Sequence, residues 1–444
     1  MTEAAQGTRL PRALRPFASG QYRLLAGALV FSMLSVGIWL VASVWQVIQL
    51  GGSPTDLSLV AGGASLGLVL SVLIGGAAAD RIPQRYIMLT VELVRGIGFG
   101  VAAILSLTGA IQIWQLAAIA FALGIADGFF YPAYSAWLPA LISEEELLAA
   151  NGIEGVLRPT VMQAAGPALA SVIIAVWSPG IAFLVVAVVQ LGAAAALLAM
   201  RTTAVRRDLN RDRHPLISAA IDIRDGFSYM LHTRWLLATL LFAILLVLVI
   251  MGPIEVLLPF AVKDQTGGGA GAFAFALAAF GIGGAAGSLA IASSKMPRRY
   301  MTLMILGWGV GCIPLAIIGF TDQLWVMVIA LFSCGFIFSG AQVLWGTLLQ
   351  RRVPHALLGR VSSLDFFVSL ALMPVSMAIA GPLGEAVGIA PAFLFAGLVP
   401  TVLAVATLMI ARLGADELAH PLDGQSDTAV DHDAVEVEGS PSPS

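Results

Sequence analysis

Five ionisable residues lie in stretches of the chain that are otherwise almost entirely apolar: Glu92, Arg95, Asp127, Arg158 and Glu255. A charged group in such surroundings is costly, so each of them needs a structural or a functional reason. Glu92 and Arg95 are three residues apart and share one face of a helix. Counted from the polar ends of their stretches, Arg95 and Asp127 lie at depths of about 12 and 16 Å at helical rise. We therefore expect Glu92, Arg95 and Asp127 to meet between adjacent helices, and Arg158 to belong to the same intramembrane set of charges.

Glu255 differs from these residues because its own stretch contains no opposite charge. It lies between Pro253 and Pro259. A lone carboxyl group in such a place suits the binding of a proton or of a cationic substrate. In the alternative interpretation, the side chain reaches the membrane surface and pairs with Lys263.

A short polar island separates two of the apolar stretches. It contains Gly76, Asp80, Arg81, Pro83 and Arg85 and follows a run of small residues. Charged residues and a proline within six positions are typical of a tight turn between two membrane helices. We expect this island to be a hinge on the cytoplasmic side.

The apolar stretches that hold these residues predict membrane helices. Of the 444 residues, 59% are hydrophobic and only 11% are charged, a composition that excludes a soluble globular protein. Twelve stretches have about the twenty residues that a helix needs to cross the hydrocarbon layer. They cover residues 24–50, 57–79, 87–108, 112–138, 156–177, 180–200, 235–260, 270–292, 302–320, 323–349, 362–385 and 390–411. The predicted fold class is an all-α polytopic membrane protein with twelve transmembrane helices.

The loops between these stretches alternate in charge. One set is rich in basic residues, whereas the other holds a single one, Lys263. The basic set comprises Arg81, Arg85, the arginines of residues 201–213, Lys295, Arg298, Arg299, Arg351, Arg352 and Arg360. Because basic loops remain in the cytoplasm, both termini are expected there, with the chain in the plasma or inner membrane of the cell.

An internal repeat indicates two related halves. Three proline or glycine-proline positions recur at an offset of 214 or 215 residues. They are Pro83 and Pro297, Pro139 and Pro354, and Gly166-Pro167 and Gly381-Pro382. We therefore expect two pseudo-symmetric six-helix halves, residues 24–200 and 235–412, whose arrangement is parallel.

Three further segments flank these halves. Residues 1–23 are expected to be a cytoplasmic N-terminal segment. Residues 201–234 are expected to form a cytoplasmic central loop with an amphipathic helix, whose arginines attract anionic lipid headgroups. Residues 413–444 hold eight acidic residues and no lysine or arginine, and we expect a disordered acidic tail because so polar a segment cannot bury enough apolar surface.

The polar island resembles the loop between helices 2 and 3 of the major facilitator superfamily of transporters. The signature of that loop is glycine, three residues, Asp-Arg, any residue, glycine or proline, and then basic residues. Gly76, Asp80, Arg81, Pro83 and Arg85 match it. The resemblance implies two halves that rock about a central site, with the island as part of a gate.

In that superfamily, the acidic residue of the island faces the start of helix 11. Here the start of helix 11 reads Ser362-Ser-Leu-Asp365, which predicts a capping box. Two acidic groups at one helix end repel each other, so we predict that Arg81 or Arg85 bridges Asp80 and Asp365.

A second resemblance covers the segment from Phe130 to Asn151. It is similar to the helix 4 to helix 5 region of siderophore, drug and macrolide exporters, the transmembrane secretion effector branch. The branch also has a glycine-proline pair in helix 5, which Gly166 and Pro167 supply. The glycines that flank this pair in the antiporter motif are replaced by Met162, Ala170 and Ser171.

The resemblance gives Asp127 a second interpretation. Helix 4 lines the central cavity in the superfamily, so Asp127 would exchange a proton during transport. In the structural interpretation, the charges on helices 3 and 4 only hold these two helices together. Aromatic and amide residues that could line the cavity, or else serve as packing residues and interface anchors, are Trp39, Trp45, Phe129, Tyr131, Gln342 and Trp345.

The sequence predicts that the chain is not an enzyme. It has no phosphate-binding loop, no nucleophile paired with a base and no metal-ligating set. No cofactor or metal is expected, and the arginine-rich central loop lacks the stacking aromatics of a nucleic-acid binding protein. The expected partners are a small-molecule substrate, protons and membrane lipids, and we expect a monomer.

The predicted function is secondary active export of an amphipathic small molecule, such as a drug, an antibiotic or a siderophore. Proton antiport by alternating access would drive it, with Asp127 or Glu255 carrying the proton. Two alternatives stay open: an importer or lipid transporter of the same fold, and a non-transporting membrane sensor that uses the acidic tail as its output.

Overall fold

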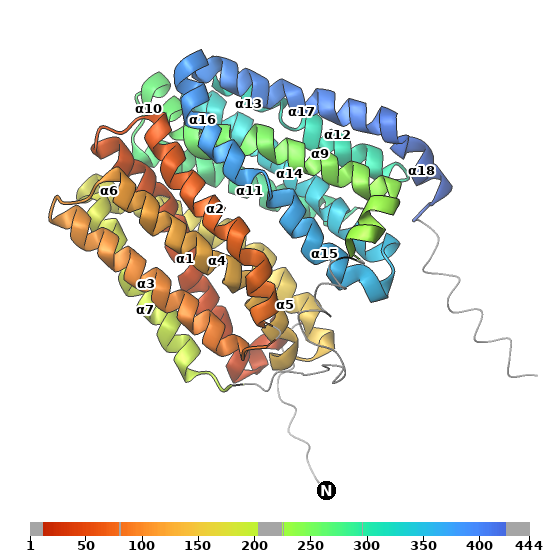
Figure 1. Cartoon of the computed structure of the whole chain (residues 1–444), viewed down its shortest axis with the longest axis horizontal. Helices are drawn as coiled ribbons and strands as arrows, with labels where there is room; N and C mark the ends of the chain where they lie inside the picture. The colour runs from red at the N-terminus through yellow and green to blue at the C-terminus, as the bar shows by residue number, and fades with distance from the viewer. Residues whose placement is uncertain (1–11, 80, 203–223, 225, 295, 423–444) are drawn as a thin grey trace, which may run out of the picture.

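The computed structural model describes residues 12–79, 81–202, 224, 226–294 and 296–422. Regular structure in this part of the chain is helical, with no strand. Twelve helical segments there are long and apolar enough to cross a membrane. The predicted fold class is therefore confirmed (Figure 1).

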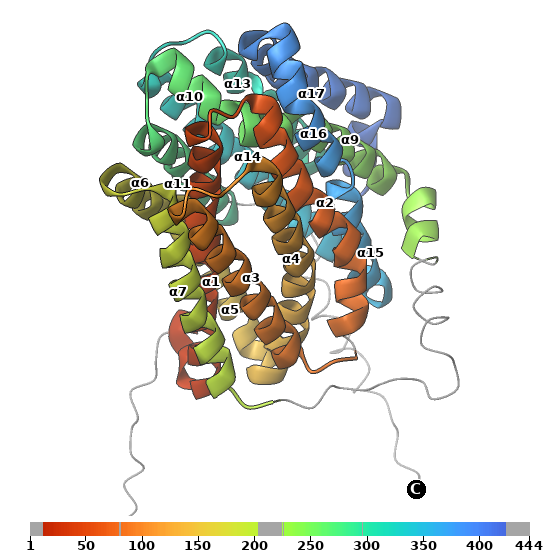
Figure 2. The ribbon, with the colours of Figure 1, turned by 60° about the vertical axis from the view of Figure 1, so that its left-hand side comes forward.

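The first six spans form one half of the molecule, and the last six form the other. The first half consists of η1 (Arg12–Ala18), α1 (Gly20–Gln49), α2 (Pro54–Ala79), α3 (Gln84–Leu107), α4 (Ile113–Leu141), α5 (Glu144–Leu157), η2 (Arg158–Ala165), α6 (Gly166–Val176) and α7 (Pro179–Ala199). The second half consists of α9 (Arg234–Gly252), η3 (Pro253–Leu257), α10 (Leu258–Thr266), α11 (Ala270–Ala292), α12 (Tyr300–Val310), α13 (Ile313–Ile318), α14 (Leu324–Arg352), α15 (His355–Leu370), α16 (Met373–Val387), α17 (Ile389–Ala411) and α18 (Leu413–Ala419). Figures 1 and 2 show the first half in red to yellow and the second in green to blue. We call the side on which α1 begins and α17 ends the terminal side.

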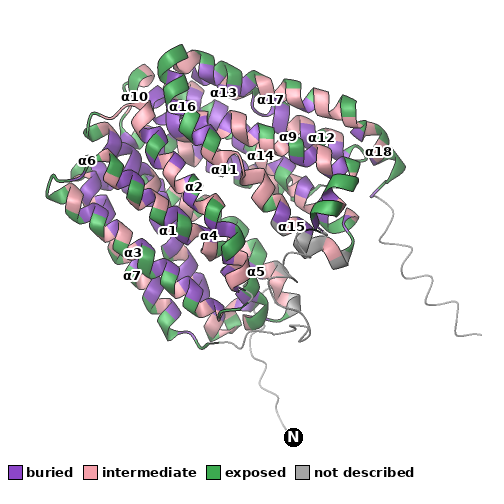
Figure 3. Cartoon of the chain, in the orientation of Figure 1, coloured by how far each residue is buried: buried purple, intermediate pink, exposed green. Residues whose placement is uncertain are grey.

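Apolar side chains cover the outside of both halves. Ile410 of α17 is 82% exposed and Leu289 of α11 is 69% exposed, and exposed residues lie on the outward faces of the helices in Figure 3. Buried residues gather where the helices contact one another. So much exposed apolar surface is stable only against lipid, which agrees with twelve membrane spans.

Glycines allow the same pair of helices to pack closely in each half. A Cβ atom at Gly63 of α2 would lie 3.1 Å from the carbonyl oxygen of Ala117 in α4. A Cβ atom at Gly335 of α14 would lie 3.1 Å from the backbone nitrogen of Gly284 in α11. Small residues bring membrane helices into van der Waals contact in this way. The second and fourth spans, and the eighth and tenth, are thus the tightly packed pairs.

Spans five and eleven are interrupted at equivalent positions. In span five, the π-helix η2 joins α5 to α6, and in span eleven α15 ends at Leu370 before α16 begins at Met373. Pro159 and Pro374 lie at these two breaks, at the 215-residue offset of the repeat. Because proline removes a backbone donor and crowds the preceding turn, it causes both interruptions.

The two halves are joined by direct hydrogen bonds on the side opposite the termini. There, the backbone nitrogen of Gly381 in α16 donates to Ser58 Oγ of α2 at 2.7 Å. The backbone nitrogen of Thr55, in the first turn of α2, donates to Glu385 Oε1 of α16 at 2.9 Å. We call these two bonds the outer contact.

The start of span eleven differs from the prediction. α15 begins at His355, with Pro354 in the N-cap position, so Ser362 and Asp365 lie within the helix. The predicted capping box from Ser362 to Asp365 is therefore wrong. The reason is that the helix starts two turns earlier, directly after a proline that suits a helix start.

The acidic tail also begins differently from the expectation. Its first residues form α18, and the carboxylate of Glu417 in α18 is buried. Glu417 Oε2 accepts hydrogen bonds from the backbone nitrogens of Met301 (2.8 Å) and Thr302 (3.0 Å), and Oε1 accepts one from Thr302 Oγ1 (2.6 Å). A carboxylate thus caps the first turn of α12 and holds α18 against it. The rest of the expected tail, from residue 423, and most of the expected central loop lie outside the described residues.

Candidate translocation site

Arg95 of α3 is the centre of a charge cluster in the first half. Its Nε lies 2.9 Å from Asp127 Oδ1 of α4, and its NH2 contacts the same oxygen. Its NH1 donates to Ser32 Oγ of α1 at 2.6 Å and lies 3.6 Å from Glu92 Oε1. Its guanidinium also lies 4.7 Å from the ring centroid of Phe130. The structure thus brings together the three charged residues that the sequence placed at similar depths.

The cluster has one guanidinium for two carboxyl groups. Glu92 is 1% exposed, and neither of its carboxyl oxygens has a hydrogen-bond partner in the described part of the chain. The side chain of Asp127, in contrast, is 40% exposed. The cluster is electrically neutral only when one of the two carboxyl groups holds a proton. Such an arrangement can bind and release a proton while Arg95 remains charged.

Arg158 does not belong to this cluster. It lies in η2, and its NH2 is 2.9 Å from Oε1 of Glu154, one turn earlier. Its guanidinium lies 5.8 Å from the ring centroid of Tyr131 in α4. The expectation of one common set of charges is therefore wrong for Arg158, because the π-helix turns it toward α4 at a different level of the span.

Glu255 lies in η3, and among the described residues it has no ion-pair or hydrogen-bond partner. Lys263, the partner considered from the sequence, lies 3.9 Å from Asp264 instead. Eight residues separate Glu255 from Lys263, which is about 12 Å along a helix and too far for a direct pair. Among the described residues, Glu255 is thus a carboxyl group without an ion-pair partner.

The hinge residues contact the first half where the structure describes them; Asp80 lies outside the described residues. Arg85 donates from Nε to the carbonyl oxygen of Leu197 (3.0 Å), from NH2 to that of Leu198 (2.6 Å) and from NH1 to Thr202 Oγ1 (2.9 Å). The carbonyl groups of Leu197 and Leu198 lie in the last turn of α7, so Arg85 caps that helix. The guanidinium of Arg85 is thereby turned away from the predicted bridge to span eleven.

The other hinge residues shape the turn. Pro83 occupies the N-cap position of α3, and Arg81 is exposed. A Cβ atom at Gly76 would meet nothing within 4 Å.

Asp365, the expected partner on span eleven, accepts a hydrogen bond from Trp345 Nε1 at 3.0 Å and one from Ser369 at 3.3 Å.

The glycine-proline pair of span five allows close packing on α1. A Cβ atom at Gly166 would lie 2.7 Å from the Cα atom of Gly37. Pro167 follows in the first turn of α6, directly after the π-helix, and has no backbone N–H with which to continue the hydrogen bonds of that helix. The pair therefore seats span five against span one directly after the π-helix.

The candidate cavity residues divide between packing positions and open positions. Trp39 packs against Phe99 and Phe183, with ring centroids 5.3 and 5.2 Å away, inside the first half. Trp45 stacks on Phe273 of α11 at 5.8 Å and so joins the two halves.

The other candidate cavity residues also divide into packing positions and open positions. Trp345 is buried among Trp235 and Trp308, at 6.3 Å from each, whereas Gln342 is exposed. Phe129 lines an apolar cavity of about 310 Å³ between α2, α3 and α4.

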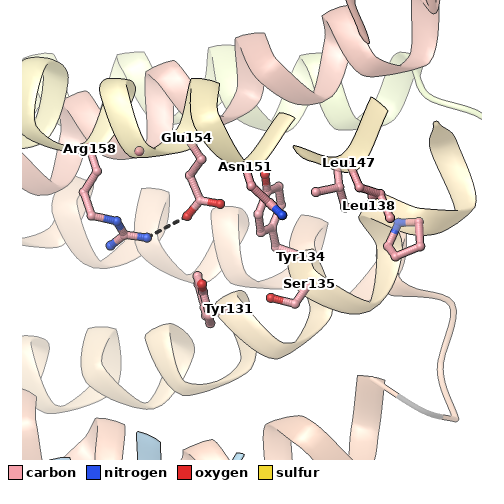
Figure 4. Close-up of a pocket in the computed structure, with 10 residues that line it drawn as sticks. Tyr131, Tyr134, Ser135, Leu138, Leu147, Asn151, Glu154 and Arg158 are labelled. Atoms are coloured by element: carbon pink, nitrogen blue, oxygen red, sulfur yellow. Dashed lines mark hydrogen bonds and ion pairs between the residues drawn. The ribbon is translucent and has the colours of Figure 1, made fainter. Parts of the chain in front are cut away.

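Tyr131 lines a larger cavity of about 500 Å³ between α4 and the α5–η2 segment (Figure 4). We call it the α4–α5 pocket. Its walls are Tyr131, Tyr134, Ser135, Leu138 and Pro139 from one side, and Leu147, Asn151, Glu154, Gly155 and Arg158 from the other. The ring of Tyr131 also stacks on Phe366 of α15, with centroids 6.0 Å apart. The pocket therefore opens next to the second half.

Three of these lining residues, Tyr134, Asn151 and Glu154, were missed in the sequence. Their signal was spacing: positions 131, 134, 135 and 138, and positions 151, 154, 155 and 158, each follow the i, i+3, i+4, i+7 pattern of one helix face. Polar residues on one face of a membrane span do not face lipid, so they line a cavity. Which two faces oppose each other is decided only by the packing.

The sequence as a whole is similar to exporters. The model of the family described as "Transmembrane secretion effector" matches residues 12–437. The multidrug efflux pump Tap of Mycolicibacterium fortuitum is 27% identical over 86% of this chain and 94% of its own length. Macrolide efflux protein A of Streptococcus pyogenes is 23% identical over 88% of this chain and 95% of its own length. The enterobactin exporter EntS of Escherichia coli is 28% identical over 82% of this chain and 85% of its own length.

Solved transporter structures share the fold. The nucleoside transporter NupG superposes with a TM-score of 0.67 at 13% identity, over 87% of this chain and 98% of its own. A POT family transporter in complex with 5-aminolevulinic acid superposes with a TM-score of 0.67 at 13% identity, over 88% of this chain and 96% of its own. The family model matches almost the whole chain, and the twelve-span fold and the superposition on solved transporters agree with that match. The chain therefore belongs to the transmembrane secretion effector family of the major facilitator superfamily.

Proposed function

We propose that the protein exports amphipathic small molecules by proton antiport, with alternating access of a central site. The observation that carries this proposal is the cluster of Glu92, Arg95 and Asp127, in which two carboxyl groups share one guanidinium inside a membrane span. A transporter that couples to the proton gradient needs such a group, whereas a sensor or a facilitator does not. Asp127 is the exposed member, so in this proposal it is the group that exchanges the proton during transport. Glu255 is the second candidate, because no described residue forms an ion pair with it.

The arrangement of the halves supports a state that is open to the terminal side. The outer contact joins α2 to α16 on the opposite side, whereas the α4–α5 pocket lies near the terminal end of α4, with Tyr131 in contact with Phe366 of the second half. We infer that the terminal side is cytoplasmic, because described basic residues such as Arg299 and Arg351 lie there, and that the protein sits as a monomer in the cell membrane. In this orientation the pocket receives substrate from the cytoplasm or the inner leaflet. The similarity to multidrug, macrolide and enterobactin exporters supports this direction of transport.

Inverted membrane vesicles test the proposal. Because a proton gradient drives export into their lumen, we expect gradient-dependent accumulation of at least one amphiphile from a pair of opposite charge, rhodamine 6G and carboxyfluorescein. Asp127→Asn should abolish the accumulation but retain downhill exchange of the same dye, and Arg299→Gln, at an exposed site on the terminal side, should behave as the parent.

Three results would point elsewhere. If Asp127→Asn retains gradient-driven accumulation and Glu255→Gln loses it, Glu255 carries the proton. If both variants retain accumulation, the coupling by the cluster is refuted. If the gradient drives dye out of the lumen, the chain is an importer.

A further inference from the structure

The polar lining of the α4–α5 pocket contains one carboxylate and one guanidinium, beside the hydroxyl groups of Tyr131, Tyr134 and Ser135 and the amide of Asn151. Its one carboxylate, Glu154, is 14% exposed and already accepts from Arg158, whose side chain is 44% exposed. Arg158 has five N–H groups, and within the described part of the chain Glu154 is its only hydrogen-bond partner. The guanidinium thus covers the carboxylate and presents its remaining donors to the open space.

A second donor in the pocket has no partner. Tyr134 is 2% exposed, and its hydroxyl lies near the carboxylate of Glu154 but makes no hydrogen bond of normal geometry among the described residues. A buried hydroxyl group without a hydrogen-bond partner costs free energy. In the wall of a pocket, a bound ligand can supply the missing partner. Asn151, on the facing wall, adds an amide group (Figure 4).

Charge decides which ligand such a pocket accepts. A cation would have to displace Arg158 from Glu154 and leave the guanidinium without its partner. An anion can bind the free N–H groups of Arg158 without breaking the ion pair, and charge-assisted hydrogen bonds of guanidinium to oxyanions are strong. Leu138, Pro139 and Leu147 provide an apolar wall beside these donors, and about 500 Å³ is the size of a site for a drug-sized molecule.

We propose that the α4–α5 pocket is the terminal-side substrate site and that it takes amphipathic organic anions, which Arg158 and Tyr134 bind by their oxyanion. This inference rests on the proposed export function and gives it a substrate class. Tyr131 lines the pocket and its ring also stacks on Phe366 of α15. Through this contact, a bound ligand can influence the movement of the two halves relative to each other.

The test is a binding measurement on the purified full-length protein in lipid nanodiscs, without a proton gradient. Fluorescence anisotropy compares two xanthene dyes of opposite charge, carboxyfluorescein and rhodamine 6G. We expect the parent to bind carboxyfluorescein, Arg158→Gln to weaken it about tenfold or more, and Tyr134→Phe to weaken it about threefold, as for one charge-assisted and one neutral hydrogen bond. Glu154→Gln should bind the anion as well as or better than the parent, because it removes a negative charge from the pocket.

Controls separate binding from folding and from surface charge. Arg158→Lys keeps the charge and should recover part of the affinity, and Arg299→Gln should leave it unchanged. Absence of carboxyfluorescein binding to the parent, binding that survives Arg158→Gln, or preferential binding of rhodamine 6G that depends on Glu154 would each overturn the inference. The binding measurement uses no proton gradient, so it is independent of the vesicle assay. If the protein binds the anion through Arg158 but fails the vesicle assay, proton-driven export is refuted and the binding site is retained.

Discussion

At the scale of single residues, Arg95 matters because so many groups depend on one guanidinium. It contacts Ser32, Glu92 and Asp127 and is only 5% exposed. Removal of one partner from a buried ion-pair group leaves charges without compensation, which costs more than the pair contributes. Arg95 is thus required for stability even where its role in coupling is set aside.

Replacement of Arg95 by methionine should therefore lower the stability of the first half by about 3 to 5 kcal/mol. Thermal unfolding of the purified protein, followed by its loss of monodispersity in detergent, measures the change. The double variant Arg95→Met with Glu92→Gln should recover part of the loss, since fewer carboxyl groups then lack a counter-charge. Equal stability of Arg95→Met and the parent would show that the carboxyl groups do not depend on this arginine.

At the scale of elements, the outer contact predicts how one helix pair controls access. Ser58 and Glu385 hold α2 to α16 on the side opposite the termini, and opening of that side must break both bonds. Ser58→Ala combined with Glu385→Ala should shift the population toward the state open on that side by roughly thirtyfold, at about 1 kcal/mol for each hydrogen bond.

Distances between spin labels at Leu50 and Phe320 measure this shift, since both residues are exposed on that side and both native cysteines are buried. The doubly substituted protein should populate longer distances than the parent. Ser293→Ala is the matched control, because the Ser293 hydroxyl donates to the carbonyl oxygen of Leu289 in α11 and, in the described part of the chain, makes no bond to another helix. A distance distribution unchanged by the double substitution would remove the outer contact from the gate.

α18 gives a second prediction at the same scale. Deletion of residues 413–444 should destabilise the terminal end of α12 by about 2 kcal/mol or more, because the backbone groups capped by Glu417 lose a buried charged acceptor. Deletion of residues 423–444 alone should leave stability and transport unchanged, since it spares α18. Thermal unfolding of the two truncated proteins distinguishes them, and equal behaviour would mean that α18 does not clamp α12.

At the scale of the whole molecule, the distribution of charge predicts the orientation. The described loops on the terminal side carry arginines such as Arg299, whereas Lys263 lies on the other side. In intact cells, a cysteine introduced at Lys263 should react with a membrane-impermeant maleimide, and one introduced at Arg299 should react only after the membrane is permeabilised. The opposite labelling pattern would invert the topology and with it the proposed direction of transport.

The sequence alone determined the elements and their order. Length and hydrophobicity specify twelve spans because crossing a membrane requires about twenty apolar residues in a helix that satisfies its own backbone. The prolines and glycines of the repeat specify two halves, since these residues act on the local backbone. The meeting of Glu92, Arg95 and Asp127 was also predictable, because charges at one depth on neighbouring helices must neutralise each other.

Only the tertiary structure decided which side chains face one another across helices. The hinge arginine Arg85 caps α7, Arg158 pairs with Glu154 beside Tyr134, and Glu417 is buried against α12. Each of these contacts depends on how a helix is rotated and where it bends, as at the π-helix η2. Rotation and bending follow from the packing of all neighbouring helices at once, so a pattern along one stretch of sequence does not specify them.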